Sequence, residues 1–431
     1  MNILLINPPI YDFAAYSLWA RPVGLLKIAS LFHYNSVNFE YFDFLDISKM
    51  DKSEIKKFKI KIKDSGRHSY PKEEIKKPDI FKTINRKFYR FGLQKEKFLK
   101  FIENINPPDY VIITSIMTYW YLGVEEVINL VRKFFPLAKI ILGGIYVNLC
   151  KEHAKKFKIN HLVSSIDEIV KILNLSNIKK KFFPLPLHLY KENYFAPIYT
   201  SFGCPYSCVY CANKFLNNSF YQRDADEVLN EIIYYYDNYK IKNFAFYDDA
   251  LLINKKQHFI PLFQKLIKLK KDFKFYCPNG LHISEIDYEV ATLMYEANFQ
   301  DIRLSLETAN EILQKKIGYK TNNKSFAKAV EYLEKASFSK NNLSVYLLVG
   351  LPHQKVEDIY SSVEFAKKFN VKVKLAEYSP IPHTKLWEEA KAVAQYNIEK
   401  EPLFHNNKIL PVATKELTID ELNKIKSFAH N

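Results

Sequence analysis

The sequence predicts an α/β chain of two domains, an open, doubly wound Rossmann-like sheet followed by a partial (β/α)6 barrel of the TIM type. Two observations predict this class. Short apolar runs alternate with segments of helical periodicity in both halves of the 431 residues. The proline- and lysine-rich stretch NIKKKFFPLPLHLYKENYFAP (177–197) interrupts that alternation. We therefore expect a first domain at 1–177, a linker at 178–195 and a barrel at 196–387.

The first domain opens with NILLIN (2–7), a continuous apolar run ended by two prolines, as expected of a strand buried on both faces of a parallel sheet. After this strand, predicted helices alternate with further strands. The further strands predicted are 37–46, 109–116, 139–144 and a short one at 160–165, and the predicted helices are 22–35, 123–135 and 151–157. Ligands of such sheets bind at the carboxyl ends of the strands.

Residues 47–105 break this pattern, because they are rich in charge, weakly periodic and interrupted by prolines. We interpret them as an insertion in the first domain that can cap a pocket. Four of its side chains are candidate substrate contacts, although a solvated surface is the favoured interpretation for a charge-rich insertion: Arg67, His68, Arg86 and Arg90.

The second domain repeats a βα unit six times. Its predicted strands are 196–202, 242–249, 272–280, 299–307, 342–350 and 372–379, and the helices between them are 225–239, 257–269, 287–297, 325–336 and 356–369. Six units are too few to close an eight-stranded barrel, so a partial barrel is expected. Residues 388–431 are expected to form a helical C-terminal extension.

Composition limits the location and the partners. The 63 Lys and Arg against 47 Asp and Glu give a net charge of +16, but lysine is spread along the whole chain, which indicates compositional drift rather than a nucleic-acid-binding stripe. Five cysteines cannot form a disulfide framework, the first residues do not resemble a signal peptide, and no apolar run is long enough to span a bilayer. We expect a cytoplasmic protein with no transmembrane segment.

Three of the five cysteines crowd into GCPYSCVYCANKF (203–215), where Cys204, Cys208 and Cys211 have the spacing C-x3-C-x2-C. The loop directly follows the first predicted barrel strand, where barrels of this type place their active sites. A structural zinc site needs four ligands, and no histidine follows within reach. A four-iron cluster also takes four ligands, so three thiolates leave one iron open to a substrate or cofactor.

This cysteine pattern, with Tyr210 before its last cysteine, resembles that of the radical S-adenosylmethionine (SAM) superfamily. The resemblance implies that all three cysteines are catalytic and hold a [4Fe–4S] cluster, whose open iron is chelated by SAM. An electron supplied by a reductant such as ferredoxin or flavodoxin then cleaves the sulfonium of SAM to give a 5′-deoxyadenosyl radical.

The resemblance extends to polar residues at the other strand ends. The residues it implies for SAM binding are Tyr210, Asp248, Asp249, Arg303, Ser305, Glu307, Gly350 and Pro352. In EYSPIPHT (377–384), His383 stands where the family usually has glycine. At the end of the third strand, Asn279 and His282 are candidate substrate contacts, while Cys277 is expected to be a buried apolar residue.

Over nearly the whole chain, the sequence is similar to the radical SAM class that carries a cobalamin-binding domain. The stretches that carry this likeness in the first domain are NPP (7–9), WARPVGLL (19–26), TSIMTYWY (114–121) and LGGIYV (142–147). The axial-histidine motif D-x-H-x-x-G of many members is absent. Small residues are placed to line the nucleotide tail of cobalamin, with tight packing as an equal alternative: Thr114, Ser115, Gly143 and Gly144.

Three functions follow from these observations. The first is a cobalamin-dependent methyltransferase that acts on a small molecule. The second is a cobalamin-independent radical SAM enzyme that catalyses rearrangement, cyclisation or RNA modification, although no RNA-binding module is present and a nucleic-acid partner is not expected. The third is a non-catalytic iron–sulfur electron-transfer protein, which needs a fourth protein ligand such as Cys277 or a histidine.

Overall fold

The chain divides into two compact units in a computed structural model that describes residues 1–175, 178, 183–217, 219–318 and 320–430. The first unit comprises Met1–Asn193 and Lys400–Leu403, and the second comprises Tyr194–Glu399 and Phe404–Asn431. The predicted linker therefore belongs to the first unit up to Asn193. Its residues 179–182, and residues 176–177 at the predicted end of the first domain, lie outside the described part.

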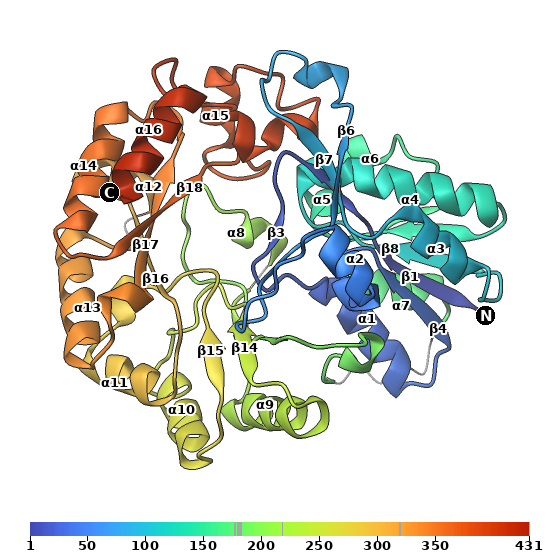
Figure 1. Ribbon diagram of the computed structural model, residues 1–431, viewed down its shortest axis with the longest axis horizontal. Coiled ribbons are helices and arrows are strands. Elements are labelled where there is room, and N and C mark those ends of the chain that lie inside the picture. Colours follow the sequence, from blue (N-terminus) through green and yellow to red (C-terminus); the bar gives the residue numbers. More distant parts are fainter. Residues whose placement is uncertain (176–177, 179–182, 218, 319, 431) are drawn as a thin grey trace. The chain divides into compact units, whose positions relative to one another are not determined.

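The first unit is built on a five-stranded parallel sheet in the order β10-β9-β8-β1-β4 (Figure 1). Its strands are β1 (Ile3–Asn7), β4 (Phe39–Asp43), β8 (Tyr110–Ile113), β9 (Lys139–Leu142) and β10 (His161–Leu162). Every residue of β1 is buried, as the continuous apolar run predicts. The chain order reverses between β1 and β8, and such a switch point is where doubly wound sheets bind ligands at the carboxyl edge.

The helices of this sheet follow the predicted alternation with one correction. They are α1 (Val23–Tyr34), α4 (Tyr121–Phe134), α5 (Ile145–Leu149), α6 (Lys151–Ala154) and α7 (Ile166–Ile172). The helix predicted at 151–157 is present as α6 but ends earlier, and a helix that was not predicted, α5, precedes it after Gly144, whose φ is 102°. Cys150, with φ −132°, then separates α5 from α6.

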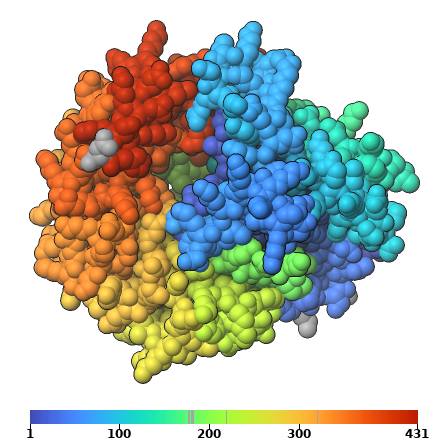
Figure 2. Space-filling model, viewed as in Figure 1, coloured from blue at the N-terminus to red at the C-terminus, as the bar shows by residue number. Residues whose placement is uncertain are grey.

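The insertion is folded. Its elements, together with two short strands that follow β1, are β2 (Ile10–Asp12), β3 (Tyr16–Ser17), α2 (Lys52–Lys57), β5 (His68–Ser69), β6 (Lys72–Ile75), β7 (Phe88–Phe91) and α3 (Lys95–Ile102). β2, β7 and β6 form one antiparallel sheet, and β3 pairs with β5. The rings of Phe81 and Phe88 pack on Phe13 at centroid distances of 5.0 and 5.1 Å. On the face seen in Figure 2, this segment forms a large part of the surface of the first unit.

The solvated-surface interpretation is wrong for two of the four candidate side chains of the insertion. The guanidinium of Arg90 is buried and pairs with Glu126 of α4, with 2.7 Å between Nη2 and Oε1. His68 is also buried, and that burial lowers its pKa to about 4. The other two lie on aromatic rings, Arg67 over Trp19 and Arg86 over Phe13.

Residues Lys400–Leu403 return from the C-terminal part of the chain to the first unit. Glu401 accepts a hydrogen bond of 2.9 Å at Oε1 from the hydroxyl of Tyr121, the first residue of α4. The helix after β8 is thus tied to a segment that lies far away in the sequence.

The second unit contains six parallel strands in two three-stranded sheets, β11-β14-β15 and β16-β17-β18. These strands are β11 (Ala196–Ile198), β14 (Asn243–Phe246), β15 (Lys274–Tyr276), β16 (Ile302–Glu307), β17 (Leu343–Val349) and β18 (Lys372–Glu377). Parallel bridges from Phe275 to Phe299 and from Leu281 to Leu304 join the two sheets. The predicted fold class, with its partial (β/α)6 barrel, is confirmed.

Helices lie on the outer side of these strands (Figure 1). The helices of the barrel are α9 (Ala225–Tyr239), α10 (Phe259–Lys268), α11 (Tyr288–Glu296), α12 (Glu311–Ile317), α13 (Asn323–Lys335) and α14 (Val356–Lys367). The C-terminal helices α15 (Trp387–Val393) and α16 (Ile419–His430) also belong to this unit. Leu386 and Ala390 pack in one apolar cluster with Ile317. Within the described residues, no helix has both the length and the apolar character needed to cross a bilayer.

The first predicted barrel strand is divided in two. After β11, the chain turns and forms β12 (Ser201–Phe202), which pairs antiparallel with β13 (Tyr221–Gln222). Asp248, at the end of the neighbouring strand β14, holds this turn by accepting hydrogen bonds from Thr200 and Ser201. The cysteine loop therefore connects β12 and β13, the two strands of one hairpin.

Candidate active site

The cysteine loop lies between β12 and β13, beyond the carboxyl end of the first barrel strand. Cys204 and Cys208 are partly exposed and Cys211 is exposed. The backbone N–H of Cys211 donates to the carbonyl of Cys208, and the N–H of Asn213 donates to the sulfur of Cys211 at 3.4 Å. The thiols are thus accessible to ligands in a loop whose backbone is already folded.

Two segments from elsewhere in the second unit hold this loop. The N–H of Val209 donates to the carbonyl of Ile317 at 3.2 Å, and its carbonyl accepts from Leu386 at 2.9 Å. Gly318 has a φ of +131°, and a Cβ at this position would lie 3.1 Å from the Cα of Cys208. Glycine is therefore needed both for its backbone conformation and for the close approach.

A single zinc ion and a four-iron cluster place different demands on the three thiols. Across the described residues, no group of three His, Cys, Asp or Glu side chains is arranged to hold one metal ion. A zinc site needs its ligands around one point, whereas the thiolates of a four-iron cluster bind different irons. Burial raises the pKa of the Cys277 thiol well above its usual value, which disfavours Cys277 as a thiolate ligand.

Glu307, at the end of β16, is the centre of a polar network beside the loop. Its Oε1 accepts a hydrogen bond of 2.9 Å from the hydroxyl of Tyr210 and lies 2.8 Å from Nζ of Lys320. Burial opposes the charge of Lys320, but Glu307 and Cys208 raise its pKa above the usual value. The structure therefore brings together Tyr210, Glu307 and the cysteine loop, and it adds Lys320, which no motif in the sequence singles out.

The two aspartates after β14 have different environments. Asp248 is buried and its carboxylate accepts hydrogen bonds from Thr200 and Ser201, so its role here is to fix the turn before the cysteine loop. Asp249 accepts a hydrogen bond from the side-chain amide of Asn213, just after the last cysteine. Desolvation and the neighbouring Asp248 raise the pKa of Asp249 to about 6. Of the two, Asp249 is the carboxylate next to the loop.

Arg303 and Ser305 have their contacts within the barrel strands, and their predicted role in SAM binding stays a prediction. Arg303 lies near the amino end of β16, where its Nη2 pairs with Asp301 at 2.7 Å and its Nη1 donates to the hydroxyl of Tyr346 at 2.6 Å. Ser305 is buried against Gly280, where a Cβ would lie 2.4 Å from its Oγ. These contacts account for both residues by packing and pairing within the barrel.

His282 lies beside the cysteine loop, and Asn279 joins strand ends. The imidazole of His282 stacks on the ring of Tyr206, within the loop, at 4.3 Å and 29°. Burial and the charge of Lys320 lower the pKa of His282 to about 4, so its ring is neutral at pH 7. The side-chain amide of Asn279 donates to the carbonyl of Tyr247 at 2.9 Å, which links the third strand end to the second.

The turn after β17 contains Gly350, with φ +82°, followed by the buried Pro352. The N–H groups of Gly350 and Leu351 both donate to Oε1 of Gln354, at 2.8 and 3.2 Å. The glutamine side chain thus holds this turn in the shape that the glycine permits. Sequence reasoning missed Gln354, because its function depends on a contact within the turn and not on a motif.

His383, which stands where the family usually has glycine, has a φ of +66°. This is the left-handed region that glycine adopts more readily. Its ring stacks on Phe215 of α8 (Asn213–Leu216), the short helix after the cysteine loop, at 4.0 Å and 6°.

In the first unit, a small pocket lies at the switch point between β1 and β8. Its lining residues are Asn7, Pro8, Pro9, Ile10, Thr114, Ser115, Ile116, Met117, Trp120 and Val124. Gly143 and Gly144 pack against protein instead, because a Cβ on Gly143 would lie 3.0 Å from Val163 and one on Gly144 would lie 2.2 Å from the carbonyl oxygen of Ser115. Packing accounts for both glycines, while contact between Thr114 or Ser115 and a nucleotide tail stays a prediction.

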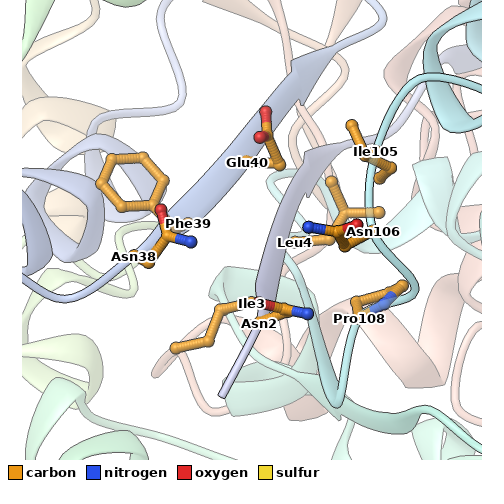
Figure 3. A pocket seen from close by; sticks show the side chains of 9 residues that line it. All are labelled: Asn2, Ile3, Leu4, Asn38, Phe39, Glu40, Ile105, Asn106 and Pro108. Atoms are coloured by element: carbon orange, nitrogen blue, oxygen red, sulfur yellow. The ribbon is translucent and has the colours of Figure 1, made fainter.

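A second pocket of the first unit lies at the opposite edge of the sheet (Figure 3). It is lined by the residues that open β1 and β4 and by the segment before β8: Asn2, Ile3, Leu4, Asn38, Phe39, Glu40, Ile105, Asn106 and Pro108. This is the amino-terminal edge, away from the edge where doubly wound sheets bind their ligands. We therefore do not consider it a candidate site.

Comparison with known proteins addresses the cysteine loop directly. A model of the radical SAM superfamily matches residues 198–366, from the end of β11 to α14, and so includes all three cysteines. Residues 198–366 therefore match the radical SAM superfamily, and this match lies within the second unit. The predicted family is thereby confirmed, and the cofactors of a radical SAM domain are a [4Fe–4S] cluster and SAM.

One curated relative is an uncharacterized methyltransferase of Pyrococcus horikoshii, 26% identical over 249 residues, which are 57% of this chain and 50% of the relative. The chain thus spans about half the length of this relative.

Two solved radical SAM enzymes share the fold over nearly the whole chain. The SAM methyltransferase TsrM from Kitasatospora setae, with cobalamin and a [4Fe–4S] cluster bound, superposes with a TM-score of 0.65 at 13% identity, covering 92% of this chain and 79% of TsrM. The cobalamin-dependent enzyme OxsB superposes with a TM-score of 0.58 at 11% identity, covering 94% of this chain and 57% of OxsB. At these identities, the likeness concerns the fold alone.

Proposed function

We propose that this radical SAM protein is a methyltransferase that acts on a carbon atom of a small molecule, with cobalamin as the methyl carrier. The observation that carries the proposal is the three-cysteine loop at the carboxyl edge of a radical SAM barrel, which leaves one iron of the cluster for SAM. The methyltransferase name of the curated relative and the fold shared with TsrM support methyl transfer as the outcome.

When bound, the cluster and SAM supply a reductive cleavage of the sulfonium that yields a 5′-deoxyadenosyl radical. The protein's part is to hold and orient these groups. Cys204, Cys208 and Cys211 would ligate three irons, and Glu307 would accept hydrogen bonds from the amino or ribose groups of SAM, since its carboxylate lies beside the loop. Asp249 is the second carboxylate next to the loop and would share this role.

The first unit would hold cobalamin at the carboxyl edge of its sheet. The order β10-β9-β8-β1-β4 and the pocket at the β1–β8 switch point support this position. Because the sequence lacks D-x-H-x-x-G, cobalamin would bind without the protein imidazole that this motif places beneath cobalt. The same absence, with the packing role of Gly143 and Gly144, favours the second candidate, a cobalamin-independent radical SAM enzyme.

The reaction also needs an electron, which we assign to a one-electron carrier of the ferredoxin or flavodoxin class. A cluster with one open iron is sensitive to oxygen, so we place the enzyme in the reducing cytoplasm.

Cysteine variants test the cluster assignment. After anaerobic reconstitution, we expect about four irons per chain and reductive cleavage of SAM by the wild-type protein. C204A, C208A and C211A should each lose the cluster and the cleavage, because three protein ligands are already the minimum. C277A is the matched control, since its thiol is buried, and it should keep both.

The same preparation separates the two candidate functions. Protein purified with hydroxocobalamin should retain a corrin absorption band if the methyltransferase proposal is right, and loss of the band on desalting would favour the cobalamin-independent enzyme. An intact four-iron cluster that does not cleave SAM would contradict both candidates.

A further inference from the structure

We infer that Lys320 is a charge-tuning residue, whose ammonium group raises the reduction potential of the cluster held by Cys204, Cys208 and Cys211. The inference rests on the proposed function, because it concerns the cluster of the same site. It assigns a role to a residue that lies outside the cysteine motif and outside the strand ends that the sequence singles out.

The first step is the position of the charge. Lys320 is 14% exposed, and its Nζ lies 2.8 Å from Oε1 of Glu307, which is 9% exposed. Nζ also lies 5.9 Å from the ring centroid of Tyr210, within the cysteine loop. A partly desolvated cation held by an acid and beside a ring has little freedom to move into water, so its charge is fixed next to the loop.

The second step is the effect of removing the charge. The segment that leads to Lys320 lies against the loop, since a Cβ on Gly318 would lie 3.1 Å from the Cα of Cys208. Glu307 offsets part of the positive charge in the wild type. Removing the ammonium while Glu307 stays nevertheless makes the surroundings of the loop more negative.

The third step separates Lys320 from other cations of the second unit. Arg223 pairs with Glu231 at 2.7 Å and donates to the carbonyl of Tyr199. Lys255 pairs with Asp287, and Lys316 pairs with Glu389 in an exposed position. The acidic partner of Lys320, in contrast, is Glu307, which itself contacts the loop through Tyr210.

The consequence for the cluster is electrostatic. Reduction adds one electron from an external donor and changes no bond to the protein, so a nearby fixed positive charge stabilises the reduced form more than the oxidised form. The net charge around a cluster and its hydrogen bonds are established determinants of its potential. Removing the Lys320 charge should therefore make the cluster harder to reduce.

A redox titration of the reconstituted protein, followed by electron paramagnetic resonance of the reduced cluster, tests this inference. In K320M, we expect the equilibrium constant for reduction to fall about tenfold, which corresponds to about 59 mV for one electron. K320R keeps the charge and should titrate with the wild type. K316M removes an exposed, ion-paired lysine of α12, the helix that ends at Ile317 before Lys320, and is the matched control, with no shift expected.

Equal midpoint potentials in K320M and the wild type, with equal iron contents, would overturn the inference and leave the proposed function intact. K320Q guards against a variant that fails to fold. If both neutral variants lose the cluster while K320R keeps it, the charge is required for assembly, and the role in tuning is refuted. If the wild-type protein takes up no four-iron cluster, the proposed function itself fails.

Discussion

His383 shows how one residue can carry two opposing contributions to stability. Its φ of +66° lies in the left-handed region, which costs a side chain with a Cβ about 1–2 kcal/mol. Its ring recovers part of this cost by stacking on Phe215 at 4.0 Å, a contact worth about 0.5–1.5 kcal/mol. The stack also joins the loop after β18 to the helix that follows the cysteines.

Two substitutions separate these contributions. H383A loses the stack and keeps the backbone strain, so we expect the free energy of unfolding to fall by about 1 kcal/mol. H383G loses the stack but relieves the strain, and it should stay within about 0.5 kcal/mol of the wild type. Urea unfolding of both variants measures the difference. If H383G is as unstable as H383A, backbone strain at this position is not significant.

For single residues, the sequence predicts a functional role where the residues that act together are close in the chain. Cys204, Cys208 and Cys211 are recognisable because a single loop contains all three, and the glycine departure at His383 is visible in the sequence and matches its backbone conformation. Lys320 could not be predicted, because its role depends on an ion pair with Glu307 that only the folded barrel forms. The position of Arg303 at a strand end predicts contact with the cofactor, and only the folded barrel shows that Asp301 and Tyr346 are partners of its guanidinium.

Helices α1 and α4 each contain a glycine near the amino end, and the two glycines have different surroundings. A Cβ on Gly123 of α4 would lie 1.8 Å from the carbonyl oxygen of Pro9, which is backbone and cannot move aside cheaply. A Cβ on Gly24 of α1 would meet nothing within 4 Å. Gly123 is therefore required for packing, while Gly24 only weakens its helix.

Alanine at these two positions should have opposite effects. We expect G24A to stabilise the protein by about 0.5 kcal/mol, because alanine favours the helix, and G123A to destabilise it by about 2 kcal/mol or more through overpacking. Thermal or urea unfolding compares them directly. A stabilising G123A would mean that α4 can shift away from Pro9 at little cost.

Most of the predicted strands and helices are present, since apolar runs and helical periodicity are properties of short segments. The division of the first barrel strand into β11 and β12 was not visible, because the hydrogen bonds of Asp248 to Thr200 and Ser201 cause it. The solvated-surface interpretation of residues 47–105 is wrong at Arg90 for a related reason. Its charge suggests solvent, but the burial of Arg90 depends on its partner Glu126 in a distant helix.

At the scale of the whole molecule, buried histidines make stability depend on pH. Burial lowers the pKa of His68, His282 and His405 to about 4 each. An unfolded histidine titrates near pH 6.5, so between pH 6.5 and 4 the unfolded chain binds protons that the folded chain excludes. The stabilising contribution is therefore complete above pH 6.5 and is lost as the pH falls toward 4.

We expect the free energy of unfolding at pH 5 to be lower than at pH 7.5 by about 2 kcal/mol for each such histidine. His405, whose Nε2 contacts the carbonyl of Ile398 at 2.7 Å, is a suitable probe because it is not among the predicted site residues. In H405Q, the loss between the two pH values should shrink by about 2 kcal/mol. An unchanged pH dependence in H405Q would show that this histidine is protonated in the folded protein.

The return of Lys400–Leu403 to the first unit has a consequence for synthesis on the ribosome. The chain passes from one unit to the other at residues 193/194, 399/400 and 403/404. The amino-terminal unit thus lacks Glu401, the partner of the Tyr121 hydroxyl, until nearly all of the later unit has emerged from the exit tunnel. Domains generally fold as they are translated, amino-terminal first. Here the unit that is synthesised first is completed last, when Lys400–Leu403 joins it.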